Sequence, residues 1–283
     1  MSKPVAVVTD STASIPPDMV AQYPLRVVPL RVVWDGEIFL DGVDLTPEAF
    51  YQRLRTSKTL PTTSQPPAQD FVEVFQSLLD EGYDILTVVI SSKMSGTLNS
   101  AEQAKAILGA ENIAIVDSLS TAMETGFHAL LAARAAAAGA TLAECQAIAE
   151  QAREHSGLLL MVPTLEYLHR GGRIGGASRW FGTLLRIKPI LEVRGGRVEP
   201  LEKVRTRRKV IQRIADITVE RIGDRRPVRL SAIHTGATEE AQSLLEQLAR
   251  RVEVEESFLS MVSPVVGTHV GPEGVGLVYV AGM

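Results

Sequence analysis

Short apolar runs alternate with longer amphipathic stretches through the first half of this 283-residue chain. The apolar runs stand at residues 5–8, 85–90 and 113–116, and each has the length of one buried strand. Helix-period stretches occupy residues 68–79, 97–108, 121–138 and 142–154. Strands that alternate with helices pair in parallel and are covered on both faces. The pattern therefore predicts an α/β protein that begins with a parallel α/β/α sandwich domain.

One segment interrupts this alternation. Residues 25–34 and 37–40 flank Asp35-Gly36, a dipeptide that favours a tight hairpin turn. We expect a small β-ribbon inserted near residues 25–46. A further strand is predicted at residues 158–162, followed by Pro163. The parallel α/β domain is therefore expected to span residues 1–163.

The pattern changes after residue 163. A glycine-rich basic stretch, residues 170–176, follows a short helical segment. Gly195-Gly196 then separates residues 190–193 from residues 197–198, which predicts a second hairpin. Further helices are predicted at 203–220 and 238–251, and further strands at 228–233, 254–259 and 275–280. Hairpins mixed with helices predict a smaller α+β domain over residues 164–283.

Four loops next to the expected strands and helices are rich in hydroxyl side chains. They are residues 9–14, 61–67, 91–97 and 117–121. Ligands of parallel sheets bind beyond the carboxyl ends of the strands. Residues 61–67 and 91–97 also have the composition of helix N-termini, where free N–H groups bind small anions. These two loops therefore predict an anion site, with the alternative that their hydroxyls only cap their own helices.

The chain contains no motif of a catalytic or nucleotide-binding site. It has neither a Gly-x-Ser-x-Gly elbow nor a Gly-x-x-x-x-Gly-Lys phosphate loop. Its five histidines are dispersed without metal-ligand spacing, and its single cysteine, Cys145, excludes a multi-cysteine metal site. We therefore expect no metal and no cofactor. His269 stands out because residues 265–274 around it are rich in glycine and predict a loop.

Charge and hydropathy limit the location and the partners. No run of about 18 apolar residues is present, and the first apolar run is too short for a secretory signal, so we expect a cytoplasmic protein. The net charge of −4 argues against nucleic-acid binding. Residues 170–213, however, contain thirteen Lys or Arg and three Glu. This basic segment is interpreted as a solvated face, a docking face for an acidic protein, or a surface for transient contact with an anionic membrane.

Seven short motifs are spread over nearly the whole chain. They are residues 8–12 (VTDST), 41–44 (DGVD), 62–66 (TTSQP), 90–97 (ISSKMSGT), 116–118 (VDS), 168–174 (LHRGGRI) and 267–269 (GTH). Each is weak by itself, but their order and spacing resemble the DegV family. These bacterial fatty-acid-binding proteins serve as acyl-carrying subunits of fatty acid kinase. The resemblance implies a parallel α/β/α domain, then a smaller α+β domain, with the ligand held between them.

The resemblance also implies roles for particular residues. A long-chain fatty acid would place its carboxylate at the hydroxyl loops and its acyl chain in an apolar tunnel. The implied site residues are Thr63, Ser95, Gly96 and His269 for the carboxylate, and Arg170 and Arg205 for the entrance that faces the ATP-dependent kinase subunit. Val270 stands where the family often has Thr, and Glu273 where a small residue is common. Both departures affect the expected contacts of the head group.

The acyl chain should supply most of the affinity. Burying ~15 methylenes at ~0.8 kcal/mol each gives a gross gain of ~12 kcal/mol, before the entropy lost on binding. Residues 158–162 and 180–185 are apolar candidates for the tunnel wall. The sequence therefore predicts a lipid carrier without activity of its own, which presents the carboxylate for acyl-phosphate formation in phospholipid synthesis. Two alternatives remain: a hydrolase or transferase that uses Ser95 and His269 on a small anion or acyl substrate, and a lipid-sensing regulatory protein.

Overall fold

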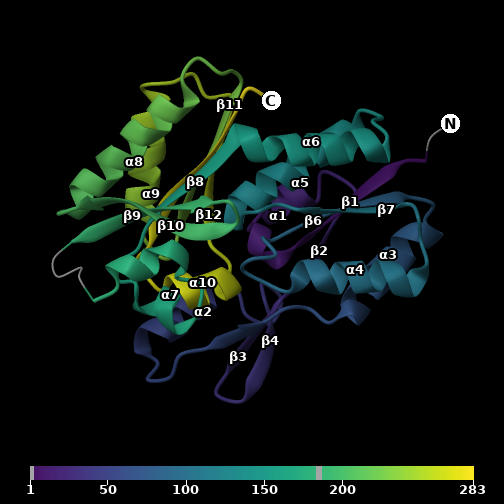
Figure 1. Cartoon of the computed structure of the whole chain (residues 1–283), viewed down its shortest axis with the longest axis horizontal. Helices are drawn as coiled ribbons and strands as arrows, with labels where there is room; N and C mark the ends of the chain where they lie inside the picture. The colour runs from purple at the N-terminus through teal and green to yellow at the C-terminus, as the bar shows by residue number, and fades with distance from the viewer. Residues whose placement is uncertain (1–2, 183–186) are drawn as a thin grey trace.

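The computed structural model describes residues 3–182 and 187–283. In this part of the chain the strands form three sheets (Figure 1). The first sheet has the order β2-β1-β6-β7, and all its neighbouring strands are parallel. Its strands are β1 (Val5–Asp10), β2 (Leu25–Val28), β6 (Asp84–Val89) and β7 (Ile113–Asp117).

Helices cover both faces of this sheet (Figure 1). Helices α3 (Ala68–Asp80) and α4 (Thr97–Leu108) pack on one face, where Phe71 and Phe75 join the buried side chains of β1 and β6. Helices α5 (Ala122–Ala137) and α6 (Leu142–His155) pack on the other. The predicted α/β/α sandwich is confirmed.

The second sheet has six strands in the order β10-β9-β8-β13-β11-β12. All its neighbours are antiparallel except β11 and β12. Helices α8 (Arg207–Ile222) and α9 (Thr238–Ala249) cover one face, and α5 contacts the other. The strands are β8 (Ser156–Met161), β9 (Lys188–Arg194), β10 (Arg197–Val204), β11 (Val228–His234), β12 (Glu256–Met261) and β13 (Val275–Ala281).

Strand β8 belongs to the second sheet. The sequence predicts it as the last strand of the first domain, but it pairs with β13 and β9. Sheet membership therefore changes at Ser156, at the end of α6. A division near residue 155 agrees better with the strand pairing than one at residue 163, and the division into domains stays a prediction.

The ribbon differs from the prediction in its first strand. Residues 25–34 do not form one strand, because Pro29 separates β2 from β3 (Arg31–Trp34) and has no N–H for a strand ladder. Strand β3 pairs with β4 (Glu37–Leu40) around Asp35-Gly36, whose φ angles of 54° and 85° suit a type I′ turn. Strand β5 (Thr62–Ser64) pairs with the other edge of β3. Helix α2 (Pro47–Thr56) packs against this third sheet.

Two predictions in the second half were wrong. Strand β10 continues to Val204, so α8 begins at Arg207 rather than at residue 203, with Thr206 as its N-cap. Residues 265–274 are not simply a loop, because helix α10 (Pro264–Val270) begins after Ser263, whose hydroxyl accepts the N–H of Val266. A Ser followed by Pro is a helix start signal. The remaining short elements are η1 (Ser11–Ala13), α1 (Pro17–Val20), α7 (Glu166–Arg170) and η2 (Gly175–Trp180).

Two classes of feature are missing from the described residues. No helix formed by residues 3–182 and 187–283 has both the length and the apolar character needed to cross a bilayer. Over the same ranges, no group of three or more His, Cys, Asp or Glu side chains could hold a metal ion.

Candidate functional site

A cavity lies between the first and second sheets. Its walls are mostly aliphatic. They include Leu30, Ile90, Met94, Ala122, Leu158, Leu160, Met161, Leu168, Val193, Val198, Ile233, Val262, Val265, Val266, Val270 and Val275.

Polar side chains gather on one part of the wall. Thr63 Oγ1 lies 2.9 Å from His269 Nε2, and both residues line the cavity. Ser95 also lines it, and its Oγ lies 2.8 Å from Thr97 Oγ1. Arg173 lies beside them and donates from Nε to the carbonyl of Met94, at 3.0 Å. An apolar cavity with donors in one region suits a ligand with one polar end.

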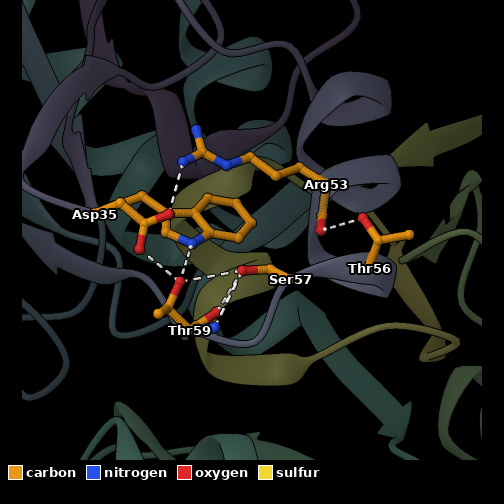
Figure 2. Close-up of polar contacts among 6 residues, drawn as sticks. Asp35, Arg53, Thr56, Ser57 and Thr59 are labelled. Atoms are coloured by element: carbon orange, nitrogen blue, oxygen red, sulfur yellow. Dashed lines mark hydrogen bonds and ion pairs between the residues drawn. The ribbon is translucent and has the colours of Figure 1, made fainter.

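Thr63 is positioned by the third sheet. It sits opposite Val32 of β3 in the ladder between β3 and β5. A hydrogen-bond network fixes the chain just before it (Figure 2). Asp35 accepts from Thr59 Oγ1 at 2.6 Å and from Arg53 at 3.0 Å, and Ser57 Oγ donates to the carbonyl of Thr59. The ribbon turn therefore anchors the approach to β5.

Helix α10 positions His269 from the opposite side. Asp41 accepts the N–H of Val265 in the first turn of this helix, and Tyr51 donates to the carbonyl of Val262 at 2.9 Å. Gly171 faces the His269 ring so closely that a Cβ there would overlap Nδ1. The ring is therefore confined between α10 and the chain after α7.

His269 is a neutral imidazole at physiological pH. Burial penalises the charged ring, and the nearby Arg173 adds repulsion, so the pKa of His269 is lowered to about 4. Its Nδ1 is buried and has no hydrogen-bond partner among the described residues. An unpaired lone pair is easier to accommodate than an unpaired N–H, which favours the tautomer with the proton on Nε2.

Gly96 is the N-cap of α4 and approaches Gln65. A Cβ at Gly96 would lie 2.6 Å from Gln65 Nε2, so a larger residue would displace this side chain. The N–H of Gly96 has no acceptor in the described part of the chain. The prediction of two converging helix N-termini was only partly right. Residues 62–64 form strand β5, and α3 begins later, at Ala68, without a side-chain cap.

A surface cleft adjoins the polar region. Thr63, Arg173 and His269 line both the cavity and this cleft. Arg170 lines the cleft as well and pairs with Glu166 at 2.6 Å. Arg205 is exposed and lines neither space. The predicted entrance role is thus compatible with the position of Arg170, while that of Arg205 stays a prediction.

Several observations extend the site beyond the predicted residues. The cavity is also lined by Arg173, Gln65 and His234, for which no role was predicted. Arg173 and Gln65 lie within two of the quoted motifs, which was the only available signal. Val270 lines the cavity, whereas Glu273 is exposed and therefore does not crowd a carboxylate. Of the tunnel candidates, residues 158, 160 and 161 line the cavity, and residues 183–185 lie outside the described residues.

The fold and the site define a class: an α/β protein in which an apolar cavity between two sheets opens through a polar region. The model of the DegV family matches residues 4–282. The chain therefore belongs to the DegV family.

Relatives and solved structures agree over nearly the whole chain. It is 36% identical over 279 residues to a DegV domain-containing protein of Clostridium perfringens, covering 97% of this chain and 98% of that protein. A structure described as fatty acid binding of a DegV family protein from Thermus thermophilus has a TM-score of 0.93 and 34% identity, with 98% and 99% of the chains covered. DegV from Bacillus subtilis, described as a fatty acid binding protein, has a TM-score of 0.88 and 34% identity, with 99% and 100% covered.

Proposed function

We propose that this protein carries a long-chain fatty acid, with the acyl chain in the cavity and the carboxylate at Thr63, Ser95, Gly96 and His269. The observation that carries the proposal is that Thr63, Arg173 and His269 line both the apolar cavity and the surface cleft. A ligand that fills the cavity can therefore keep its polar end within reach of solvent.

The head group meets donors of three kinds. Nε2–H of His269 donates to Thr63 Oγ1, which leaves the threonine hydroxyl free to donate to the carboxylate. The hydroxyl of Ser95 and the unpaired N–H of Gly96 complete the set. Arg173 supplies a positive charge to the site, so His269 does not need to be protonated to attract the carboxylate. Each charge-assisted hydrogen bond contributes roughly 1.5–3 kcal/mol, so the head group orients a ligand whose tail supplies most of the affinity.

The carrier presents its carboxylate to a separate ATP-dependent fatty acid kinase subunit, which forms the acyl-phosphate. Arg170 borders the cleft and belongs to the basic segment of residues 170–213. A surface of this charge favours an acidic partner and also transient contact with an anionic membrane during lipid exchange. The protein itself needs no catalytic group in this role, and it acts in the cytoplasm.

The hydrolase or transferase alternative has less support. The hydroxyl that pairs with His269 is that of Thr63, whereas Ser95 pairs with Thr97. A serine-type mechanism also needs a third group that orients the base. Among the described residues His269 Nδ1 has no such partner. A lipid-sensing regulator would share the same site and would differ only in its partner.

The test is mass spectrometry of the protein purified from cells without added lipid. Native spectra should show one ligand per chain, and denaturing extraction should release a long-chain fatty acid. Replacing both Thr63 and Ser95 with Ala removes two donors and should weaken palmitate binding by roughly 100-fold. The same change should stop phosphorylation of the bound lipid by the kinase subunit.

The matched control replaces Thr56 and Ser77 with Ala. Both are exposed hydroxyls with only local hydrogen bonds, so palmitate affinity should stay at the wild-type value. A protein that stays empty after incubation with palmitate and oleate would contradict the carrier proposal. Unchanged affinity in the Thr63 and Ser95 double variant would contradict the assignment of the head-group site.

A further inference from the structure

A second cleft lies away from the head-group region. It is bordered by elements from both halves of the chain. Its lining residues are Ser118, Leu119, Glu124, Arg153, Ser156, Gly157, Glu192, Val193, Arg194, Gly195 and Arg221. Val193 of β9 also lines the cavity between the first and second sheets, so the two spaces adjoin at this strand. The proposed carrier function gives this cleft no role.

Arg153 of α6 is a half-buried arginine without a partner. Its Nε is buried and makes no hydrogen bond, and no carboxylate in the described part of the chain lies within 4 Å of its guanidinium nitrogens. Removing a guanidinium from water without a counter-charge is unfavourable. Arg153 therefore leaves one positive charge in the cleft that no protein group balances.

The acidic residues of the cleft do not remove this excess. Glu192 is almost fully buried and is shared between Arg221, at 2.6 Å, and Arg194, at 3.5 Å. One carboxylate thus faces two guanidinium groups. Glu124 accepts hydrogen bonds from Ser120 and Ser156, and burial raises its pKa to about 7, so it carries only part of a charge near neutral pH.

We infer that this cleft binds a phosphate group, held by Arg153 together with Arg194 and Arg221. The three guanidinium groups lie on three different elements: Arg153 is on α6, Arg194 on β9 and Arg221 on α8. Several planar forks from separate directions suit a tetrahedral oxyanion better than a single planar carboxylate. The phosphate is either a free ion or part of a small organic phosphate.

Isothermal titration calorimetry with inorganic phosphate tests the inference. The protein is saturated with palmitate beforehand, so that the head-group region is occupied. One phosphate should bind per chain, and Arg153→Gln should weaken this binding at least tenfold. Arg194→Gln is a second variant on an exposed side chain that should not affect folding, and it should weaken binding several-fold. Acetate at the same concentrations should bind more weakly.

Arg250→Gln is the matched control. Arg250 is exposed at the end of α9, has no hydrogen bond or ion pair from its side chain among the described residues, and lines none of the three spaces above. The phosphate affinity of this variant should equal that of the wild type.

A parallel titration with glycerol phosphate distinguishes a free phosphate ion from a small organic phosphate. If glycerol phosphate binds more tightly than inorganic phosphate, the ligand is an organic phosphate. If it binds more weakly, the ligand is the free ion. No binding by the wild type, or equal affinity in wild type and Arg153→Gln, overturns the inference. The arginine variants should still bind palmitate as the wild type does. A loss of phosphate binding is then separate from the carrier function.

Discussion

Replacing Glu124 with Gln should change how the stability of this protein depends on pH. Glu124 lies on α5, is only 5% exposed, and contacts the hydroxyls of Ser120 and Ser156. Burial is the largest cause of its raised pKa, which is about 7 against an ordinary value of 4.5. Glutamine has nearly the same shape and stays neutral at every pH, so the substitution removes the titration. Its amide cannot accept from both Ser120 and Ser156, and this loss adds a constant offset that does not change with pH.

The expected magnitude follows from the two pKa values. A carboxyl whose pKa is higher in the folded state binds more protons when folded, so its contribution to stability falls as pH rises from 4.5 to about 7. At ~1.4 kcal/mol per pKa unit, the wild type should lose about 2.5 kcal/mol from this group between pH 5 and pH 8. The Glu124→Gln variant should lose none of it.

Urea unfolding followed by circular dichroism, at intervals from pH 5 to pH 8, measures the effect. The quantity to plot is the unfolding free energy of the variant minus that of the wild type, because other titrating groups cancel in this difference. It should rise with pH by about 2.5 kcal/mol. Gln151→Ala, at an exposed position of α6 that carries no titrating group, should give a flat line. A flat line for Glu124→Gln as well would refute the assigned pKa and its cause.

Two further substitutions test how His269 is positioned. Gly171→Ala should push a methyl group against the His269 ring and weaken palmitate binding at least tenfold in a fluorescent-lipid displacement assay, and unchanged affinity would show that the ring can move aside. Asp41→Asn should lower the unfolding free energy by about 1–3 kcal/mol, since an amide cannot accept from both Ser11 Oγ and the N–H of Val265. A urea midpoint equal to that of the wild type would contradict the role given to Asp41.

Periodicity predicted most of the fold because the apolar runs are short and clearly bounded. The parallel strands β1, β6 and β7 and the helices between them were expected nearly at their observed positions. The errors occur where the local sequence pattern does not show which strands pair with each other. Residues 25–34 were expected to form one arm of a ribbon, yet β2 and β3 on the two sides of Pro29 belong to different sheets. Strand β8 looked like a continuation of the first half, and only long-range pairing with β13 assigns it to the second.

The contacts within the candidate site were harder to predict from local sequence patterns than the fold was. Thr63 and His269 are 206 positions apart, and no periodicity predicts that their side chains form a hydrogen bond. The family resemblance assigned both residues to one site but did not predict the hydrogen bond between them. Arg173 was missed because an arginine in a basic segment looks like a solvated side chain until the fold shows it beside the cavity.

Helix α5 is buried without a break from Ala122 to Ala133 because it packs against both large sheets. Phe127 on this helix lies 5.8 Å, centre to centre, from the ring of Phe258 on β12, at the far edge of the second sheet. A hybrid that joined the first half of this chain to the second half of a relative would therefore bring together surfaces shaped for different neighbours. Recombination within this family is expected to succeed only when α5 and the six-stranded sheet come from the same parent.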